Sequence, residues 1–203
     1  MAGEGSLLAA GRGDQELMER FVAEAHRLRG AGDPESRCTA ALVHARAAVS
    51  RGELAGVAEM VEPVLRIEQV AGELRTAILG VAVDDALRGP DPGKIEGLLE
   101  ILGALAPVQV TPVRLALRAR LEAERAHLMS QAEVAHDHEQ EALERLRGAG
   151  ARPYEVAALL DIARRHDDAD ALSSARALCA ELGATRWLEQ IDAGSGVTTQ
   201  TPA

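Results

Sequence analysis

Three of the six histidines lie in the stretch "HLMSQAEVAHDHEQE", residues 127–141, beside several carboxylates. Histidine and carboxylate side chains are frequent metal ligands and general acids or bases. On a helix, however, His136 and His138 would point about 200° apart, and a two-ligand clasp needs a spacing of roughly three or four residues. We therefore expect a solvated helix face, with Glu141 paired to an arginine one turn later. A metal-binding or catalytic cluster of His127, His136 and His138 is kept as the alternative.

A glycine–lysine pair in "GPDPGKI", residues 89–95, raises the question of a phosphate-binding loop. Such a loop has four residues between its glycines and a Ser or Thr after the lysine. Here three residues separate the glycines, and Ile95 follows Lys94. The two prolines also lack the backbone N–H groups that hold phosphate. We expect no nucleotide and no other cofactor to bind here.

A second acidic stretch, "RRHDDAD" at residues 164–170, contains three candidate catalytic carboxylates. Asp167 or Asp168 is better explained as the N-cap of the next helix, because a carboxylate there accepts hydrogen bonds from free backbone N–H groups. We expect His166 to pack at a helix interface. The sequence therefore predicts no catalytic residue, no metal ligand and no enzyme activity.

The composition favours an all-α protein that does not bind nucleic acid. Hydrophobic residues make up 47% of the 203 residues, and Ala, Leu and Val predominate over aromatic residues. Small side chains of this kind suit closely packed helices. The formal net charge of −10 repels phosphate backbones and anionic membranes. Four arginines are expected to form a solvated helix face, namely Arg114, Arg118, Arg120 and Arg125.

The cysteines and the apolar runs bear on location. Cys38 and Cys179 belong to no ligand or redox motif, and we expect Cys179 to pack as a small hydrophobic residue at a helix interface. Charges interrupt each apolar run well before the roughly 18 residues that a membrane-spanning helix needs, and residues 1–14 carry no secretion signal. These features predict a cytoplasmic protein.

Apolar residues at helical spacing, with Gly and Pro as boundaries, predict ten helices within a domain over 12–193. Asp14 and Asp33 are expected as N-caps, with Pro34 at the first helical position. We expect residues 1–11 to be flexible and the small, polar tail 194–203 to be disordered. The predicted helices are 14–29, 34–50, 53–67, 70–87, 93–105, 112–129, 132–147, 153–166, 168–182 and 185–192.

Two glycine–aromatic pairs recur with a shift of 33 residues. Gly150 and Tyr154 align with Gly183 and Trp187, the chain's only tyrosine and only tryptophan. A glycine after a helix supplies the left-handed position that ends it. We therefore predict that both aromatic residues seal adjacent helix hairpins and that Trp187 caps the end of the array.

The spacing of small and apolar positions resembles that of the 34-residue tetratricopeptide repeat family. The stretch "SRGELAGV" (50–57) looks like that family's turn between its two helices. The chain departs from the pattern in the proline-rich linker 88–93 and in the 41-residue step from Pro112 to Pro153. The matching positions are Leu159, Ile162, Ala163, His166, Ala175, Cys179 and Leu182, and earlier Ala41, His44, Ala45, Ala48, Gly52, Val57, Val61 and Val64.

A narrower resemblance lies in residues 152–193, "RPYEVAALLDIARR…ALCAELGATRWLEQIDA". This stretch is similar to the C-terminal repeat regions of bacterial LuxR-type ATPase regulators and multidomain nucleotide cyclases. In such proteins the helical array is a sensor or docking surface, and the chemistry is elsewhere. The resemblance implies that the chain is the C-terminal part of a transcriptional or signalling regulator, or a remnant of one.

Together these features predict an all-α solenoid of antiparallel helix hairpins, a superhelix like that of tetratricopeptide repeats. We expect a non-catalytic protein–protein interaction module with a regulatory or scaffolding role, which binds a protein or peptide in its concave groove. The competing hypothesis is a small helical enzyme or ligand-binding protein that uses the histidine cluster. A third hypothesis is a homodimer that forms through Trp187.

Overall fold

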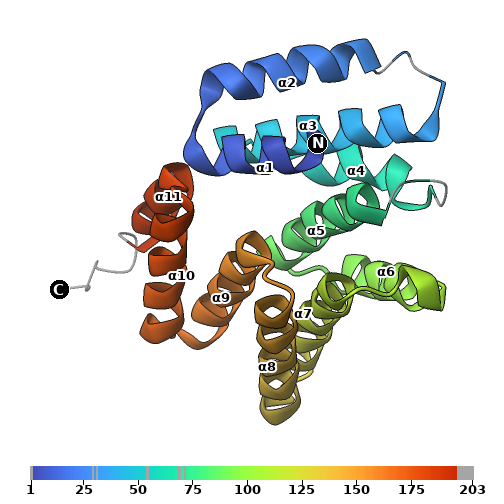
Figure 1. Ribbon diagram of the computed structural model, residues 1–203. Coiled ribbons are helices and arrows are strands. Elements are labelled where there is room, and N and C mark those ends of the chain that lie inside the picture. The colour runs from blue at the N-terminus through green and yellow to red at the C-terminus, as the bar shows by residue number, and fades with distance from the viewer. Residues whose placement is uncertain are drawn as a thin grey trace.

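The structure is a computed structural model that describes residues 2–28, 30, 32–53, 55–67, 70 and 72–195. Within these residues it is all-α, without a β-strand (Figure 1). None of the described helices is long and apolar enough to cross a membrane. The helices are α1 (Ala2–Arg12), α2 (Gln15–Leu28), α3 (Pro34–Arg51), α4 (Val57–Leu65), α5 (Gly72–Arg88), α6 (Pro92–Gly103), the short 3₁₀ helix η1 (Pro107–Gln109), α7 (Pro112–Leu128), α8 (Ala132–Gly148), α9 (Arg152–His166), α10 (Ala169–Leu182) and α11 (Thr185–Ser195).

All ten predicted helices are present, and their capping residues explain where they begin and end. The backbone N–H of Leu17 donates to Asp14 Oδ1 (2.9 Å), and that of Ser36 donates to Asp33 Oδ1 (2.8 Å). Of the two candidate caps before α10, Asp168 is the one that accepts hydrogen bonds from its free N–H groups. The largest boundary difference is at α4, which begins at Val57 because Gly56 has a left-handed φ of 90°.

Residues 1–11 were expected to be flexible, whereas the structure has helix α1 at Ala2–Arg12. This helix has no strong apolar pattern of its own. It is stabilised by long-range packing, because Ala9 and Ala10 are buried in a small cluster with Met18 of α2 and Ala47 of α3. Most of the predicted disordered tail, 196–203, lies outside the described residues, and α11 continues to Ser195.

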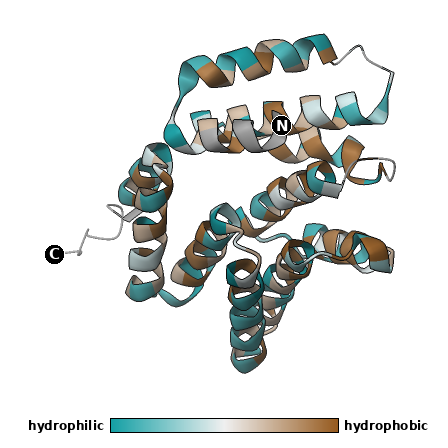
Figure 2. Cartoon of the chain, viewed as in Figure 1, coloured by the Kyte–Doolittle hydropathy of each residue, from teal (hydrophilic) through white to brown (hydrophobic). Residues whose placement is uncertain are grey.

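Two large apolar clusters form the interior, and α7 contributes to both. Leu117 and Leu121 belong to the cluster formed with α3, α4, α5 and α6. Ala116 and Ala119 belong to the cluster formed with α8, α9, α10 and α11. Tyr154 of α9 packs against both clusters. The helix α8 is mainly hydrophilic (Figure 2, teal) and packs into the second cluster through Ala142, Leu143 and Leu146.

The helices follow one another in a curved row that returns to its start (Figure 1). Consecutive helices pack on each other, and contacts also join α3 to α5 and α5 to α7. At the end of the row α11 contacts α1. The two ends of the chain are tied together where Thr185 Oγ1 donates to the carbonyl of Arg12 (2.9 Å).

Candidate functional sites

The three histidines of the predicted cluster do not converge. His138 Nδ1 lies 3.4 Å from Glu141 and 3.6 Å from Glu122, whereas His136 Nδ1 lies 3.9 Å from Glu139. The ring of His127 instead packs edge-to-face on the ring of His166, with ring centroids 6.4 Å apart. Over the part of the chain that the structure describes, no group of three or more His, Cys, Asp or Glu side chains could hold a metal ion.

The carboxylates near these histidines are held by arginines. Glu141 accepts two hydrogen bonds from Arg145, at 2.6 and 3.1 Å, as the sequence predicted. These bonds, with a smaller contribution from His138, lower the pKa of Glu141. The side chain therefore stays ionised and paired near neutral pH, which suits a structural contact.

A buried polar network joins α7, α8 and α9. Glu124 of α7 and Glu139 of α8 are each only 2% exposed, and Arg165 of α9 donates to both at 2.7 and 2.8 Å. His166 Nε2 lies 2.9 Å from both oxygens of Glu139, as expected of an interface histidine. Buried charges are tolerated when they are paired and hydrogen-bonded. This network fixes three helices relative to one another.

A second buried network joins alternate helices through Arg120. The guanidinium of Arg120 in α7 donates to Asp84 of α5 and to Asp161 of α9, each at 2.8 Å. Arg120 is 2% exposed, so it does not belong to a solvated arginine face. The sequence prediction was also wrong for Arg114, which is 3% exposed. Both arginines are buried because α7 is covered on several sides by other helices.

The shared guanidinium also shapes the titration of this network. Burial raises the pKa of Asp84, although its side chain keeps 36% exposure, and the charge of Arg120 only partly opposes this effect. Burial alone would lower the pKa of Arg120, but the two carboxylates raise it overall. The hydrogen bonds from Arg120 to the two carboxylates join α5, α7 and α9 in this ion triplet.

The glycines of the two repeated pairs have the predicted backbone conformation. Gly150 and Gly183 both have a φ of 64°, and Gly183 is the C-cap of α10. The aromatic residues of the two pairs contact helices outside the neighbouring hairpin. The ring of Tyr154 lies against Gly80 of α5, and the ring of Trp187 lies against Gly11 of α1. Each aromatic residue thus joins helices that are distant in sequence.

Both cysteines are buried in the apolar clusters, as the sequence predicted for Cys179. Cys38 lies in α3 and Cys179 in α10, and neither forms a disulfide. Burial raises the pKa of both thiols. A raised thiol pKa leaves little thiolate near neutral pH, and the thiolate is the reactive form. These side chains contribute packing.

A cleft of about 700 Å³ opens where the two ends of the chain meet. Arg51 and Arg186 in its wall are already engaged, because they pair with Glu53 (2.8 Å) and Glu189 (3.0 Å). Arg12 has no ion pair with a described carboxylate. The wall is formed by α1, α2, the end of α3 and the start of α11, and it includes Arg12, Asp14, Met18, Val22, Arg51 and Arg186.

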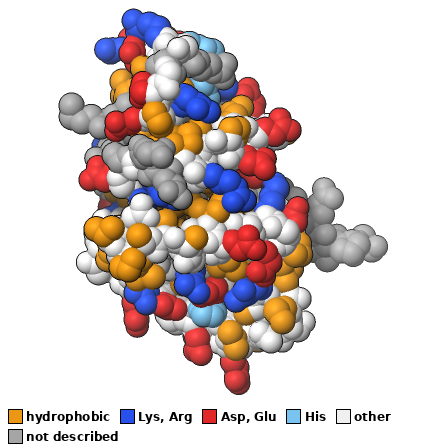
Figure 3. All heavy atoms as spheres, turned by 90° about the vertical axis from the view of Figure 1, so that its right-hand side faces the viewer, with side chains coloured by type: hydrophobic (Ala, Val, Ile, Leu, Met, Phe, Trp, Pro, Cys, Tyr) orange, Lys and Arg blue, Asp and Glu red, His pale blue; other side chains and the backbone are white. Residues whose placement is uncertain are grey.

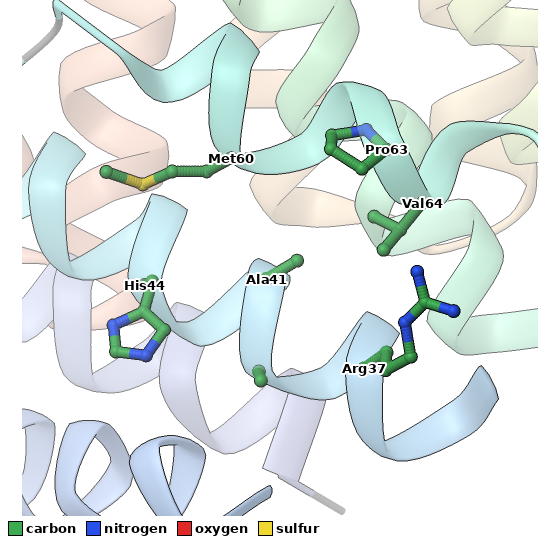
Figure 4. A pocket seen from close by; sticks show the side chains of 7 residues that line it. Arg37, Ala41, His44, Met60, Pro63 and Val64 are labelled. Atoms are coloured by element: carbon green, nitrogen blue, oxygen red, sulfur yellow. The ribbon is translucent and has the colours of Figure 1, made fainter. Parts of the chain in front are cut away.

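A smaller cavity of about 220 Å³ lies between α3 and α4 (Figure 4). Met60 and Val64 of α4 face Ala41 of α3, with the side chains of Arg37 and His44 at its edges. None of the described residues that line this cavity carries a carboxylate, hydroxyl or thiol group. Its walls are mainly apolar and offer no pair of groups that could act as acid and base.

No protein-family model matches the chain, and neither a curated protein nor a solved structure matches it.

Proposed function

We propose that this chain is a non-catalytic helical module that binds a peptide segment of a partner protein, in a regulatory or scaffolding role. The observation that carries the proposal is the cleft of about 700 Å³ between α2 and α11. Clefts of this size suit ligands larger than an ion, and grooves between helices are a recurring site of peptide recognition.

The chemistry of the cleft suggests what the peptide contains. Arg12 offers a cation that no described carboxylate neutralises, and Met18 and Val22 of α2 offer an apolar wall beside it. An acidic side chain would pair with Arg12, while an apolar side chain would pack on α2. We therefore propose a partner segment in which an acidic residue and a large apolar residue lie close together.

The proposed fold is a short solenoid of helix hairpins, like that of tetratricopeptide repeats, whose ends meet. The predicted concave groove is a less suitable place for the partner. On the inner side Tyr154 packs against Gly80, and Arg120 bridges Asp84 and Asp161. These contacts occupy the space that a peptide would need, so we place the partner at the cleft.

Two unpaired, buried cysteines support a reducing compartment such as the cytoplasm.

The test is selection of peptides from a random display library against the immobilised chain. We expect enriched peptides that share an acidic and an apolar residue. Arg12→Glu should weaken their binding about tenfold or more, since a charge-assisted contact becomes repulsive. Arg20→Glu is the matched control, because Arg20 is an exposed residue of α2 outside the cleft wall. Absence of enrichment, or equal effects of the two variants, would contradict the proposal.

A further inference from the structure

Arg75 of α5 is buried, and no described residue supplies an acceptor for two of its nitrogens. The residue is 9% exposed, and neither Nε nor Nη1 has a hydrogen-bond partner. Burying a charge without a partner is unfavourable, because the hydration that it loses is not replaced. Buried polar groups in native proteins are almost always hydrogen-bonded. An acceptor from outside the chain would resolve this exception.

A second buried arginine lies beside it. Arg114 of α7 donates to the carbonyl of Gly72 and to Thr76 Oγ1, and it also donates to the carbonyl of Gln109. All of these acceptors are neutral, so Arg114 also has no carboxylate partner among the described residues. Burial lowers the pKa of Arg114, and the positive charge of Arg75 lowers it further. Two guanidinium groups therefore repel each other in a poorly solvated place.

The start of α5 adds a further positive potential. Gly72, Arg75 and Thr76 are three and four residues apart, so they share one face of α5 within its first two turns. The N-terminal end of a helix carries about half a positive charge.

This place is near the surface and separate from the cleft. Gly72, whose carbonyl accepts from Arg114, is exposed, and Arg75 keeps a small exposed area. Figure 3 views the molecule from the side on which α5 begins, where Lys and Arg side chains lie between hydrophobic ones near the middle. No residue of α5 or α7 lines the cleft.

We propose that Arg75 and Arg114 form a binding site for a phosphate group. A guanidinium donates two parallel N–H bonds to a phosphate oxyanion, and two guanidiniums balance the charge of about −1.5 to −2 that a phosphoryl group carries at pH 7. The phosphate would supply an acceptor for one of the two unpartnered nitrogens of Arg75, Nε or Nη1. Its source is either free inorganic phosphate or the phosphoryl group of a phosphorylated peptide.

The test uses the full chain in phosphate-free buffer, with inorganic phosphate, a phosphoserine peptide and its unphosphorylated form as probes, and sodium chloride to match ionic strength. Calorimetry should detect phosphate binding to the wild type, and phosphate should raise its melting temperature. Arg75→Met should weaken binding by about tenfold or more. Arg118→Met is the control, because Arg118 is an exposed arginine of α7, the helix that carries Arg114.

The stability of the free protein gives a second readout. Arg75→Met removes an unpartnered buried charge, so without phosphate this variant should melt at the same temperature as the wild type or higher. A peptide that binds more tightly than inorganic phosphate identifies a phosphorylated partner, whereas equal affinity identifies the free ion. The proposal is overturned by a wild type that binds neither probe, by equal binding to Arg75→Met, or by an Arg75→Met variant that fails to fold or melts clearly lower.

Discussion

Replacing Gly80 by alanine tests the contact between α5 and α9. A Cβ atom at residue 80 would lie 2.6 Å from Cε1 of Tyr154, about 1 Å closer than carbon atoms normally pack. The ring cannot move freely, because Tyr154 packs against both large apolar clusters. Overpacking of this kind typically costs about 1–3 kcal/mol. Alanine is also favoured over glycine within a helix by about 1 kcal/mol, which partly offsets that cost.

The matched control is Gly97→Ala in α6. Gly97 is also inside a helix, but a Cβ atom there would meet nothing within 4 Å. We expect Gly97→Ala to raise the free energy of unfolding by about 1 kcal/mol. Gly80→Ala should leave it unchanged or lower it by up to about 2 kcal/mol, the sum of the two opposing effects. Urea denaturation followed by far-UV circular dichroism measures both values.

A double-mutant cycle isolates the contact itself. In a Tyr154→Ala background the clash is absent, so Gly80→Ala should become stabilising by about 1 kcal/mol. The coupling free energy between residues 80 and 154 should then be about 1–3 kcal/mol, as found for residues in contact. If Gly80→Ala stabilised the wild type as much as Gly97→Ala does, Tyr154 would not lie on α5 and the packing described for α9 would be wrong.

Three further predictions concern the contacts that hold the helices together. Trp187→Ala should lower the free energy of unfolding by about 3 kcal/mol, the low end for a core tryptophan because this one is half-buried. The mass of this variant by light scattering should equal that of the wild type. A lower mass would indicate a dimer held by Trp187. Arg120→Ala should lower the free energy of unfolding by about 3–5 kcal/mol, because it leaves two carboxylates unpaired. Arg118→Ala breaks only an exposed pair with Glu122 and should lower it by at most about 1 kcal/mol. Equal losses of stability in the two variants would argue against the ion triplet. The pKa of Asp84 is raised in the folded protein, so the folded state holds that proton more tightly than the unfolded state does. The stability of the wild type relative to Asp84→Asn should therefore be greatest below about pH 3.9 and fall as pH rises through the folded pKa. Equal pH dependence of the two free energies of unfolding, measured by urea denaturation, would refute this.

Local signals were sufficient to predict most of the helices. Asp33 before Pro34 marks the start of α3, and the left-handed Gly183 marks the end of α10. Helix α1 could not be found in this way, because "AGEGSLLAAGR" has no clear apolar face. Its position depends on burial against α3 and on the ring of Trp187, which comes from the opposite end of the chain.

The polar networks were missed because their members are far apart in sequence. Arg120 is 36 residues from Asp84 and 41 residues from Asp161. One signal was nevertheless present. The step from Pro112 to Pro153 is also 41 residues, so Arg120 and Asp161 occupy equivalent positions, each eight residues after a proline. Opposite charges at equivalent positions of alternate helices indicate a contact between those helices.

The most direct test of the proposed peptide-binding function is an NMR titration of the isotope-labelled chain with a selected peptide. We expect chemical-shift changes confined to backbone amides around the cleft, from Arg12 to Val22, at Ser50 and Arg51, and from Thr185 to Glu189. The amides of α5, α7 and α9 on the inner side should keep their positions. Shifts centred on those three helices, or no shifts at saturating peptide, would contradict the account.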